Sequence, residues 1–372
     1  MIRSTIAQTW DHARQIDPTL MASPRQLKAL ASRELRPVAF SRNLLFSSMA
    51  KGKPVLFKDL PVPVRGEDKV GPREAVLRAL DEGFSRRSRV LVRCGPSGKL
   101  TRIPVAELVR RWASSRARVS VTDLHIRGTP LTKTIDCSCL SDFNILAEAG
   151  GAVAEQEMLT MVVSSAGVFT DSHTDDPDGS NHCFVGRKLW LVWDTFSGLS
   201  HNLEDCERIA IETKQAAFSI SGFLSVPYSK WFFVEPNQTL FLPGHLTHKV
   251  ITLDDYLGVG SFFVMLPSYL RTLARWTERT PLWALTLPPD RRLDLVDKIT
   301  RCVINKVRAL ASAPQAEASR WGLTHLGAAV RQWQQASRGL SSRALLDNPV
   351  STELVMTVLG SIPGRGQRTS FR

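Results

Sequence analysis

The chain of 372 residues contains no hydrophobic run approaching the roughly 20 residues that a membrane-spanning helix requires, so the sequence excludes a transmembrane protein. The first segment, MIRSTIAQTWDHARQID, has no apolar stretch after its arginine, and we expect no secretory signal. Six cysteines are too few for a disulfide framework, and none of them form a CxxC pair. We therefore expect a reduced, cytoplasmic protein without a zinc finger, or a nuclear one if the source is eukaryotic.

Charged residues make up only 22% of the sequence, but Lys and Arg outnumber Asp and Glu by 48 to 35, for a net charge of +13. The excess is uneven, because residues 1–154 carry +12, residues 155–270 carry −8 and residues 271–372 carry +9. A groove for phosphate groups would not be expected to have an acidic middle. The acidic segment indicates metal ligands or a cationic substrate instead. Nucleic-acid binding by the basic flanks stays open as the less favoured alternative.

The basic N-terminal region, residues 1–154, has mixed helical and extended patterns. Apolar residues recur at helical spacing over 71–84 and 103–113. Between these helices, residues 89–103 alternate apolar and basic side chains on both sides of Pro96-Ser97-Gly98, which predicts a hairpin. We expect this region to be mixed α/β and to support the rest of the fold.

The middle and C-terminal regions differ sharply in pattern. Residues 155–270 are rich in Val, Phe, Leu and Trp in short runs broken by Gly, Pro, Asn and Asp, which is typical of a β-sandwich or barrel. Residues 271–372 have helical stripes over 290–313 and 321–333, which either cover the open end of the barrel or form a homodimer interface. The predicted fold class is thus a mainly β core with α-helical flanks. The expected strand-rich runs are 158–165, 183–194, 231–243, 248–253 and 256–266.

One set of residues in the strand-rich region has the composition of a metal site. His173 and Asp175 are two positions apart, so both side chains leave the same face of an extended segment. His248 follows much later, after an apolar strand and a proline. Two imidazoles and one carboxylate form the facial triad that holds non-haem Fe(II) and leaves positions open for a cosubstrate and dioxygen. The H-x-D pair alone is weak evidence, because such a histidine is usually a surface or capping residue.

Lys188 strengthens this hypothesis, because it precedes Trp190 on a strand that should face inward. A lysine is rarely buried without an anionic partner, so Lys188 fits the carboxylate of a bound cosubstrate. The alternative is a surface lysine whose aliphatic stem lies beside a core tryptophan.

The order and spacing of eight residues resemble the Jumonji C (JmjC) domain, in which a strand ends in T-x-x-H-x-D, a G-x-K-x-W strand follows and a proline lies five residues before the distal histidine. The match extends over roughly residues 157–266 and is closest to the small hydroxylase branch of the family. The matching residues are Thr170, His173, Asp175, Gly186, Lys188, Trp190, Pro243 and His248.

The resemblance implies a double-stranded β-helix, the jelly roll of the cupin superfamily, with Fe(II) bound by His173, Asp175 and His248. It implies 2-oxoglutarate as cosubstrate, its distal carboxylate paired with Lys188 and hydrogen-bonded by Thr170. Two positions depart from the family pattern. Leu246 and Thr247 replace an aromatic pair, and Ser261 lies near the position of a frequent asparagine, where it is a candidate cosubstrate contact.

Neighbouring residues offer competing interpretations. His245 is a second candidate for the distal ligand, but its place two residues after Pro243 indicates a turn. Asp176 should point to the opposite face from Asp175, toward solvent or substrate, and Arg187 should point away from Lys188. His182 is either a substrate contact or a hydrogen-bonded loop histidine. Core or structural roles are expected for Trp231, Phe232, Phe233, Cys137 and Cys139.

Three functions follow from these patterns. The first is an Fe(II)- and 2-oxoglutarate-dependent dioxygenase that hydroxylates a C–H bond of a protein side chain or small molecule, with succinate and CO2 as co-products. The second is an N-methyl-lysine demethylase of histones or other proteins, for which the acidic segment suits a cationic substrate. The third is a non-catalytic, cupin-like protein that binds nucleic acid. Residues 175–182 and 198–230 are the expected pocket loops, the second long enough for a lid or substrate-binding insert.

Overall fold

The computed structural model describes residues 2–84, 88–94, 99–114, 118–146, 158–175, 177–194, 218–226, 228–278, 289–336 and 348–361. The predicted turn at Pro96-Ser97-Gly98, Asp176 and most of the predicted insert at 198–230 lie outside these residues. Among the helices in the described ranges, none combines the length and the apolar character that crossing a bilayer would require.

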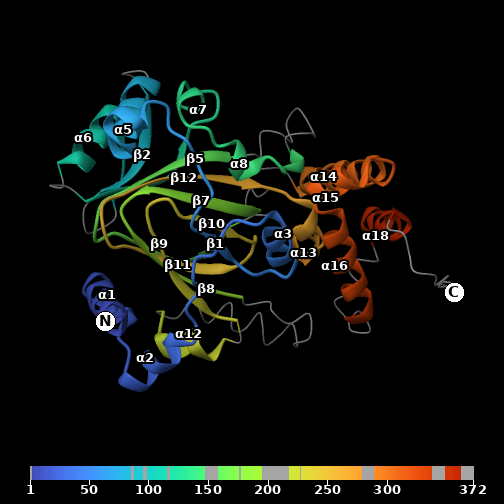
Figure 1. The fold of residues 1–372 in the computed structure, drawn as a ribbon, viewed down its shortest axis with the longest axis horizontal. Helices are drawn as coiled ribbons and strands as arrows, with labels where there is room; N and C mark the ends of the chain where they lie inside the picture. Colours follow the sequence, from blue (N-terminus) through green and yellow to red (C-terminus); the bar gives the residue numbers. More distant parts are fainter. Residues whose placement is uncertain are drawn as a thin grey trace.

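Two antiparallel sheets form the centre of the described structure (Figure 1). The eight-stranded sheet has the order β1-β10-β7-β12-β5-β4-β2-β3, and the four-stranded sheet has the order β6-β11-β8-β9. The strands of the larger sheet are β1 (Val55–Phe57), β2 (Arg89–Cys94), β3 (Lys99–Pro104), β4 (Val119–His125), β5 (Met158–Ser164), β7 (Asp178–Val185), β10 (Thr239–Leu242) and β12 (Tyr256–Phe263). Those of the smaller sheet are β6 (Phe169–Thr174), β8 (Lys188–Trp193), β9 (Lys230–Val234) and β11 (Thr247–Thr252).

From β5 to β12, successive strands cross from one sheet to the other except β8 and β9, which pair within the smaller sheet. The two sheets therefore face each other. The buried cluster between them draws on both sheets, with Val162 and Tyr256 from the larger one and Trp190, Phe232 and Val250 from the smaller one. β1 to β4 extend the larger sheet at both ends, which makes the N-terminal region part of the same sheet. The space between the sheets is therefore lined by alternate residues of strands far apart in sequence.

Helices cover the outer faces of both sheets (Figure 1). The outer face of the larger sheet packs against α3 (Arg42–Ala50), α5 (Pro72–Gly83), α6 (Val105–Ala113), α7 (Leu131–Thr134), α8 (Ser138–Ser141), α13 (Leu266–Glu278), α14 (Pro289–Ala311), α16 (Leu323–Ala336) and α18 (Pro349–Ser361). The outer face of the smaller sheet packs against α1 (Ile2–Ile16), the 3-10 helix η1 (Pro18–Leu20), α2 (Pro24–Ala31) and α12 (Ile220–Ser225). Two short helices, α4 (Glu67–Val70) and α15 (Gln315–Arg320), bury no side chain.

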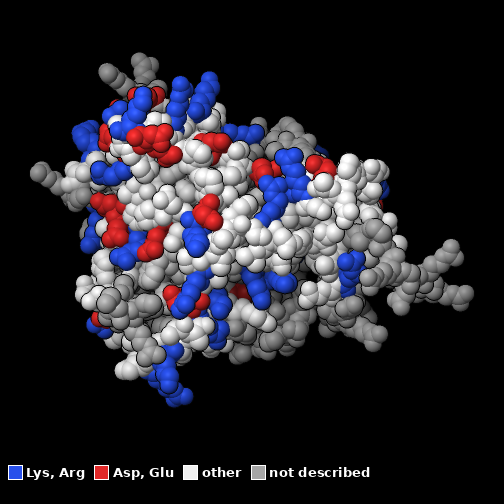
Figure 2. Space-filling view, viewed as in Figure 1, with Lys and Arg blue, Asp and Glu red and all other residues white. Residues whose placement is uncertain are grey.

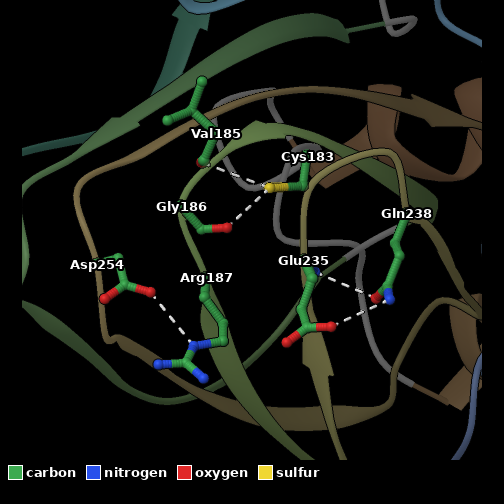
Figure 3. Close-up of polar contacts among 7 residues, drawn as sticks. All are labelled: Cys183, Val185, Gly186, Arg187, Glu235, Gln238 and Asp254. Atoms are coloured by element: carbon green, nitrogen blue, oxygen red, sulfur yellow. Dashed lines mark hydrogen bonds and ion pairs between the residues drawn. The ribbon is translucent and has the colours of Figure 1, made fainter.

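Tight turns carry the chain from one sheet to the other at the end where β7, β9 and β11 finish (Figure 3). Gly186 joins β7 to β8 with a φ of 83°, and a Cβ there would clash with the carbonyl oxygen of Asp255. Cys183 donates its thiol hydrogen to the carbonyl oxygens of Val185 and Gly186, both at 3.4 Å. These contacts close the turn and leave β8 in register with β11.

Several expectations are confirmed. The core is mainly antiparallel β with helical flanks. The helix predicted over 71–84 is α5, and those predicted over 290–313 and 321–333 are α14 and α16. The predicted hairpin pairs β2 with β3, and Trp231 and Phe232 are buried core residues.

Other boundaries were wrong. β3 continues to Pro104, so α6 starts two residues later than the pattern predicted. The runs 183–194 and 231–243 each supply strands to both sheets, because Gly186 and Asn237 reverse the chain with positive φ. The predicted loop at 175–182 is largely strand, since β7 begins at Asp178 and hydrogen-bonds to strands on both sides. The polar residues of β7 are typical of a loop when the sequence is considered alone, because the side chains that hydrogen-bond to them lie on strands distant in sequence.

The Gly186 turn makes a stability prediction. We expect Gly186→Ala to lower the free energy of unfolding by about 1–3 kcal/mol, because the new methyl group must move the Asp255 backbone and the residue must keep a positive φ. Urea denaturation measures the change. Gly360→Ala is the matched control, since Gly360 lies in α18 with open space around it and alanine favours the helix. Equal stability of wild type and Gly186→Ala would contradict the prediction.

Candidate metal centre

The pairing of β6 with β11 brings the two candidate histidines together. His173 lies opposite His248 in the register, and their ring centroids are 4.1 Å apart. Asp175 follows β6 directly and places Oδ2 3.4 Å from His248 Nε2 and Oδ1 3.9 Å from His173 Nε2. One ligand atom from each residue lies within 4.8 Å of the others, so the three side chains could hold a metal ion. His173 and Asp175 are half-buried and His248 is buried, which places the centre at the mouth of the inter-sheet space.

Backbone carbonyl groups orient both imidazoles. His173 Nδ1 lies 2.7 Å from the carbonyl oxygen of Asp171, and His248 Nδ1 lies 3.0 Å from that of Leu246. A carbonyl oxygen only accepts, so each Nδ1 must carry a proton, and each Nε2, on the side of Asp175, is the ring atom left for a metal ion. Histidine ligands of metals characteristically donate the other ring nitrogen to a carbonyl or carboxylate in this way.

The surroundings of His248 keep it neutral. Burial, helped by the neighbouring His173, lowers the pKa of His248 to about 4, although Asp175 opposes the shift. Trp190 stacks on His248 with ring centroids 5.3 Å apart and an interplanar angle of 28°. A neutral imidazole with a fixed ring plane is the form that binds a metal ion.

A buried carboxylate connects the two loops that carry the ligands. Asp178, at the start of β7, accepts hydrogen bonds from the backbone N–H of Gly244, at 2.8 Å, and from the hydroxyl of Ser268. The backbone N–H of His245 donates to the carbonyl oxygen of Asp175 at 2.9 Å. These bonds tie the loop after β6 to the loop before β11, and so hold Asp175 near His248.

A β-bulge explains how Thr170 and His173 share a face although they are three positions apart. Thr170 pairs with Val250 and His173 with His248, so three steps on β6 match two on β11. Directly paired residues point to the same side of a sheet. Val250 also pairs with Trp190, and Thr252 pairs with Lys188. Thr170, Lys188 and the metal triad therefore all lie on the inner face of the smaller sheet.

Lys188 is buried, and no acidic side chain in the described ranges forms an ion pair with it. Its Nζ lies 4.4 Å from the centroid of the Tyr256 ring. Burial lowers the pKa of Lys188 to about 7. The Tyr256 hydroxyl donates to Asn181 Oδ1 at 2.5 Å, from the opposite sheet. The indole Nε1 of Trp190, on the same inner face as Lys188, is buried without a hydrogen-bond partner. A buried cation and a buried unpaired donor are the groups that an anionic ligand would satisfy.

The remaining candidates are placed elsewhere. Ser261 is buried on β12 but shares a face with Val259 and Phe263, which belong to the helix-covered core, so it is not brought to the inner face. His245 lies on the turn after β10, with φ 67°, as the proline spacing predicted. Arg187 pairs with Asp254 at 3.2 Å (Figure 3). Its guanidinium group lies 5.9 Å from the centroid of the Phe233 ring, which packs against the outer cluster, so it is on the side of β8 away from Lys188. His182 is in strand β7, not in a loop, and bonds Thr239 Oγ1 at 2.8 Å.

Sequence patterns missed three groups near the centre. Asp178 and Asn181 were assigned to a loop, although their positions in a polar strand hold the site together. Lys249, next to His248, points to the outer face and forms a buried ion pair with Asp17, at 2.8 Å, which connects β11 to the N-terminal helices. It also pairs with the exposed carboxylate of Asp171, at 3.3 Å. The sequence pattern identified His248, but nothing in it indicated that the next residue, Lys249, would pair with Asp17, more than 200 residues earlier in the chain.

No protein-family model matches the chain, and no curated protein matches it. The assignment of the site therefore depends on its geometry.

The geometry predicts the metal-binding behaviour of ligand variants. We expect His173→Ala and Asp175→Ala each to weaken Mn2+ binding by about 100-fold or more, because each removes one of three protein ligands. Isothermal titration calorimetry on protein stripped with chelator measures the affinity. His125→Ala is the control, since it removes an exposed histidine on β4 outside the triad. Unchanged affinity in either ligand variant would show that the triad does not bind the ion.

Two buried neutral histidines make stability depend on pH. Burial lowers the pKa of both His182 and His248 to about 4, against about 6.5 in the unfolded chain. The unfolded state binds more protons between these values, so the free energy of unfolding falls as the pH drops from 6.5 to 4. Asp178, whose pKa burial raises to about 6, acts in the opposite direction.

Replacing His182 by asparagine isolates this contribution, because the carboxylates are common to both proteins. We expect the difference in unfolding free energy between wild type and His182→Asn to change by up to about 1.4 kcal/mol per pH unit between pH 6.5 and 4. Urea titrations at half-unit intervals measure it. A difference that stays constant with pH would mean that His182 titrates normally in the folded protein.

Proposed function

We propose that the protein is an Fe(II)- and 2-oxoglutarate-dependent oxygenase that hydroxylates a C–H bond of a protein side chain or small molecule. One observation carries the proposal: the triad His173, Asp175 and His248 shares the inner face of one sheet with buried Lys188, which has no acidic partner in the described residues. The triad suits iron, and the lysine suits the far end of a dicarboxylate that reaches inward from the metal.

The strand order supports the finer fold assignment of a double-stranded β-helix. The strands from β5 to β12 are divided between the sheets, with β10-β7-β12-β5 in one and β6-β11-β8-β9 in the other. Each pair of consecutive strands crosses from one sheet to the other except β8 and β9, which are neighbours in the smaller sheet, and this distribution is that of a jelly roll. It places β6 and β11, which carry the ligands, as neighbours in the same sheet.

The chemistry of the donor set favours Fe(II) over a purely structural ion. Two neutral imidazoles and one carboxylate leave coordination positions free, whereas structural zinc sites are closed by four protein ligands. When bound there, iron and 2-oxoglutarate supply dioxygen activation and oxidation of a substrate C–H bond, with succinate and CO2 as co-products.

The chain's own residues then have distinct tasks. His173, Asp175 and His248 would hold the metal, with the carbonyl groups of Asp171 and Leu246 fixing the two imidazoles. Lys188 would pair with the distal carboxylate of 2-oxoglutarate, and Thr170 would add a hydrogen bond from the adjacent edge strand. The apolar cluster around Phe232 and Trp190 keeps water from the inner part of the space.

Two tests follow at Lys188. We expect Lys188→Met to raise the KM for 2-oxoglutarate about tenfold or more, because the carboxylate loses its cation. We also expect wild-type protein to take up protons when it binds 2-oxoglutarate at pH 8, since the anion raises the lowered pKa of Lys188. Succinate formation measures the first effect, and binding enthalpies in buffers of different ionisation enthalpy measure the second.

Arg187→Met is the matched control, because it removes a neighbouring cation that points to the other side of β8. It should change neither the KM nor the proton uptake. A Lys188→Met variant that behaves like wild type in both measurements would overturn the assignment of the cosubstrate site.

The reaction itself is tested by supplying substrates. Succinate formation that requires Fe(II) and 2-oxoglutarate, and that disappears in His173→Ala, would support the proposal. Formaldehyde release from methylated lysine peptides would identify the demethylase alternative. Binding of RNA or DNA by protein that forms no succinate would instead favour the non-catalytic alternative.

A further inference from the structure

At one end of the eight-stranded sheet, side chains on one face are exposed, and no helix of the described ranges packs on them. β2 and β3 form this end, and their register places Leu91 opposite Arg102 and Arg93 opposite Leu100. Because side chains alternate along each strand, Val92 and Ile103 lie on the other side, where they join the helix-covered core. We call the uncovered surface, formed by Arg89, Leu91, Arg93, Leu100 and Arg102, the arginine-leucine face.

This face is both apolar and basic. Leu91 is 50% exposed and Leu100 is 52% exposed, and they are among the large hydrophobic side chains left open to solvent. Arg89, Arg93 and Arg102 are also exposed, and within the described ranges none of them forms an ion pair. Figure 2 shows basic and acidic side chains together over the helices at this end of the molecule, whereas β2 and β3 themselves contain no acidic residue. The face thus offers two apolar contacts surrounded by unneutralised positive charge.

The adjoining edge of the sheet is open as well. β3 is the last strand in the order, and no described strand pairs with its outer side. An edge strand presents backbone N–H and C=O groups to which an extended segment can add. Strand addition would put alternate side chains of that segment beside Leu100 and Arg102.

The positive charges of the arginine-leucine face indicate which kind of molecule would bind to it. β2 and β3 contain basic residues and no acidic ones, so a second copy of β3 would bring two positively charged hairpins together, which disfavours self-association. A single-stranded nucleic acid would use aromatic side chains for base stacking, and none of the five residues of the face is aromatic. On this face of β3 a leucine and an arginine follow each other at every second residue, so a matching segment carries carboxylates and apolar side chains in turn at every second position.

We propose that the arginine-leucine face docks an extended acidic polypeptide segment that adds as a strand to β3 and that presents carboxylates and apolar side chains in turn on this face. The proposal does not rest on the metal centre or on the proposed oxygenase activity. Its consequence is a partner, or a protein substrate, held at a surface remote in sequence from the metal ligands.

The probe is a fluorescein-labelled octapeptide in which glutamate and leucine occupy every second position in turn, with threonine between them, so that both kinds of side chain lie on one face of the extended peptide. Fluorescence anisotropy reports its binding to the full-length protein. We expect binding that weakens with salt and that falls about tenfold or more in the double variant Arg93→Glu, Arg102→Glu. The double variant Arg25→Glu, Lys28→Glu is the control, because it makes the same change of charge at exposed positions of α2. It should bind like wild type. Arg93→Gln, Arg102→Gln gives the same test without charge reversal, and thermal unfolding checks that each variant is folded.

Two further peptides separate charge from strand addition. An octapeptide with lysine in place of glutamate should not bind, and one with N-methyl groups on alternate amides should bind much more weakly. Binding of the glutamate peptide that is unchanged in both Arg93, Arg102 double variants would overturn the proposal. Equal binding of the lysine peptide or of the N-methylated peptide would also overturn it. So would a face that binds an oligouridine probe through Arg93 and Arg102 but does not bind the acidic peptide.

Discussion

The pairing of β11 between β6 and β8 is the constraint on which the candidate site depends. It sets His248 beside His173, and it brings Lys188 and Trp190 onto the same inner face, although these residues come from three separate strands. A shift of the register by one residue would turn His248 outward and Lys249 inward. The ion pairs of buried Lys249 with buried Asp17 and exposed Asp171 act against such a shift, because an inward lysine would lose both partners.

The hydrogen bonds of Asp178 hold the loops that carry the metal ligands in place. Gly244 and Ser268 both donate to this buried carboxylate, and Arg271, which contributes to its electrostatic environment, also pairs with Asp194 at the end of β8. The ends of β7, β8 and β10 and the start of α13 are thus joined beneath the metal ligands. A half-exposed centre with orienting bonds this close is pre-organised before any ion binds. The arginine-leucine face belongs to a different part of the sheet and does not share these contacts.

Much of the site was predictable because metal ligands must be particular residue types at particular spacings. The H-x-D pair and the later histidine were recognised from the sequence, and the structure brings them together. The inward direction of Lys188 and the outward direction of Arg187 also followed from strand alternation. Ser261 was selected from its place in a family pattern. On β12, however, every second residue points to the same face, and Ser261 lies with Val259 and Phe263 on the helix-covered side.

By itself, the sequence determined the classes of its regions, the candidate ligands and the helices with clear apolar stripes, because these depend on local periodicity and on side-chain chemistry. Only the tertiary structure decided that Asp178, Asn181 and His182 form a buried strand, because their hydrogen-bond partners Gly244, Tyr256 and Thr239 lie more than 50 residues away. The same holds for the bulge that turns Thr170 inward and for the exposure of Leu91 and Leu100. Local sequence patterns indicate which chemistry a residue can support, and the pairing of strands distant in sequence decides which residues are brought into one site.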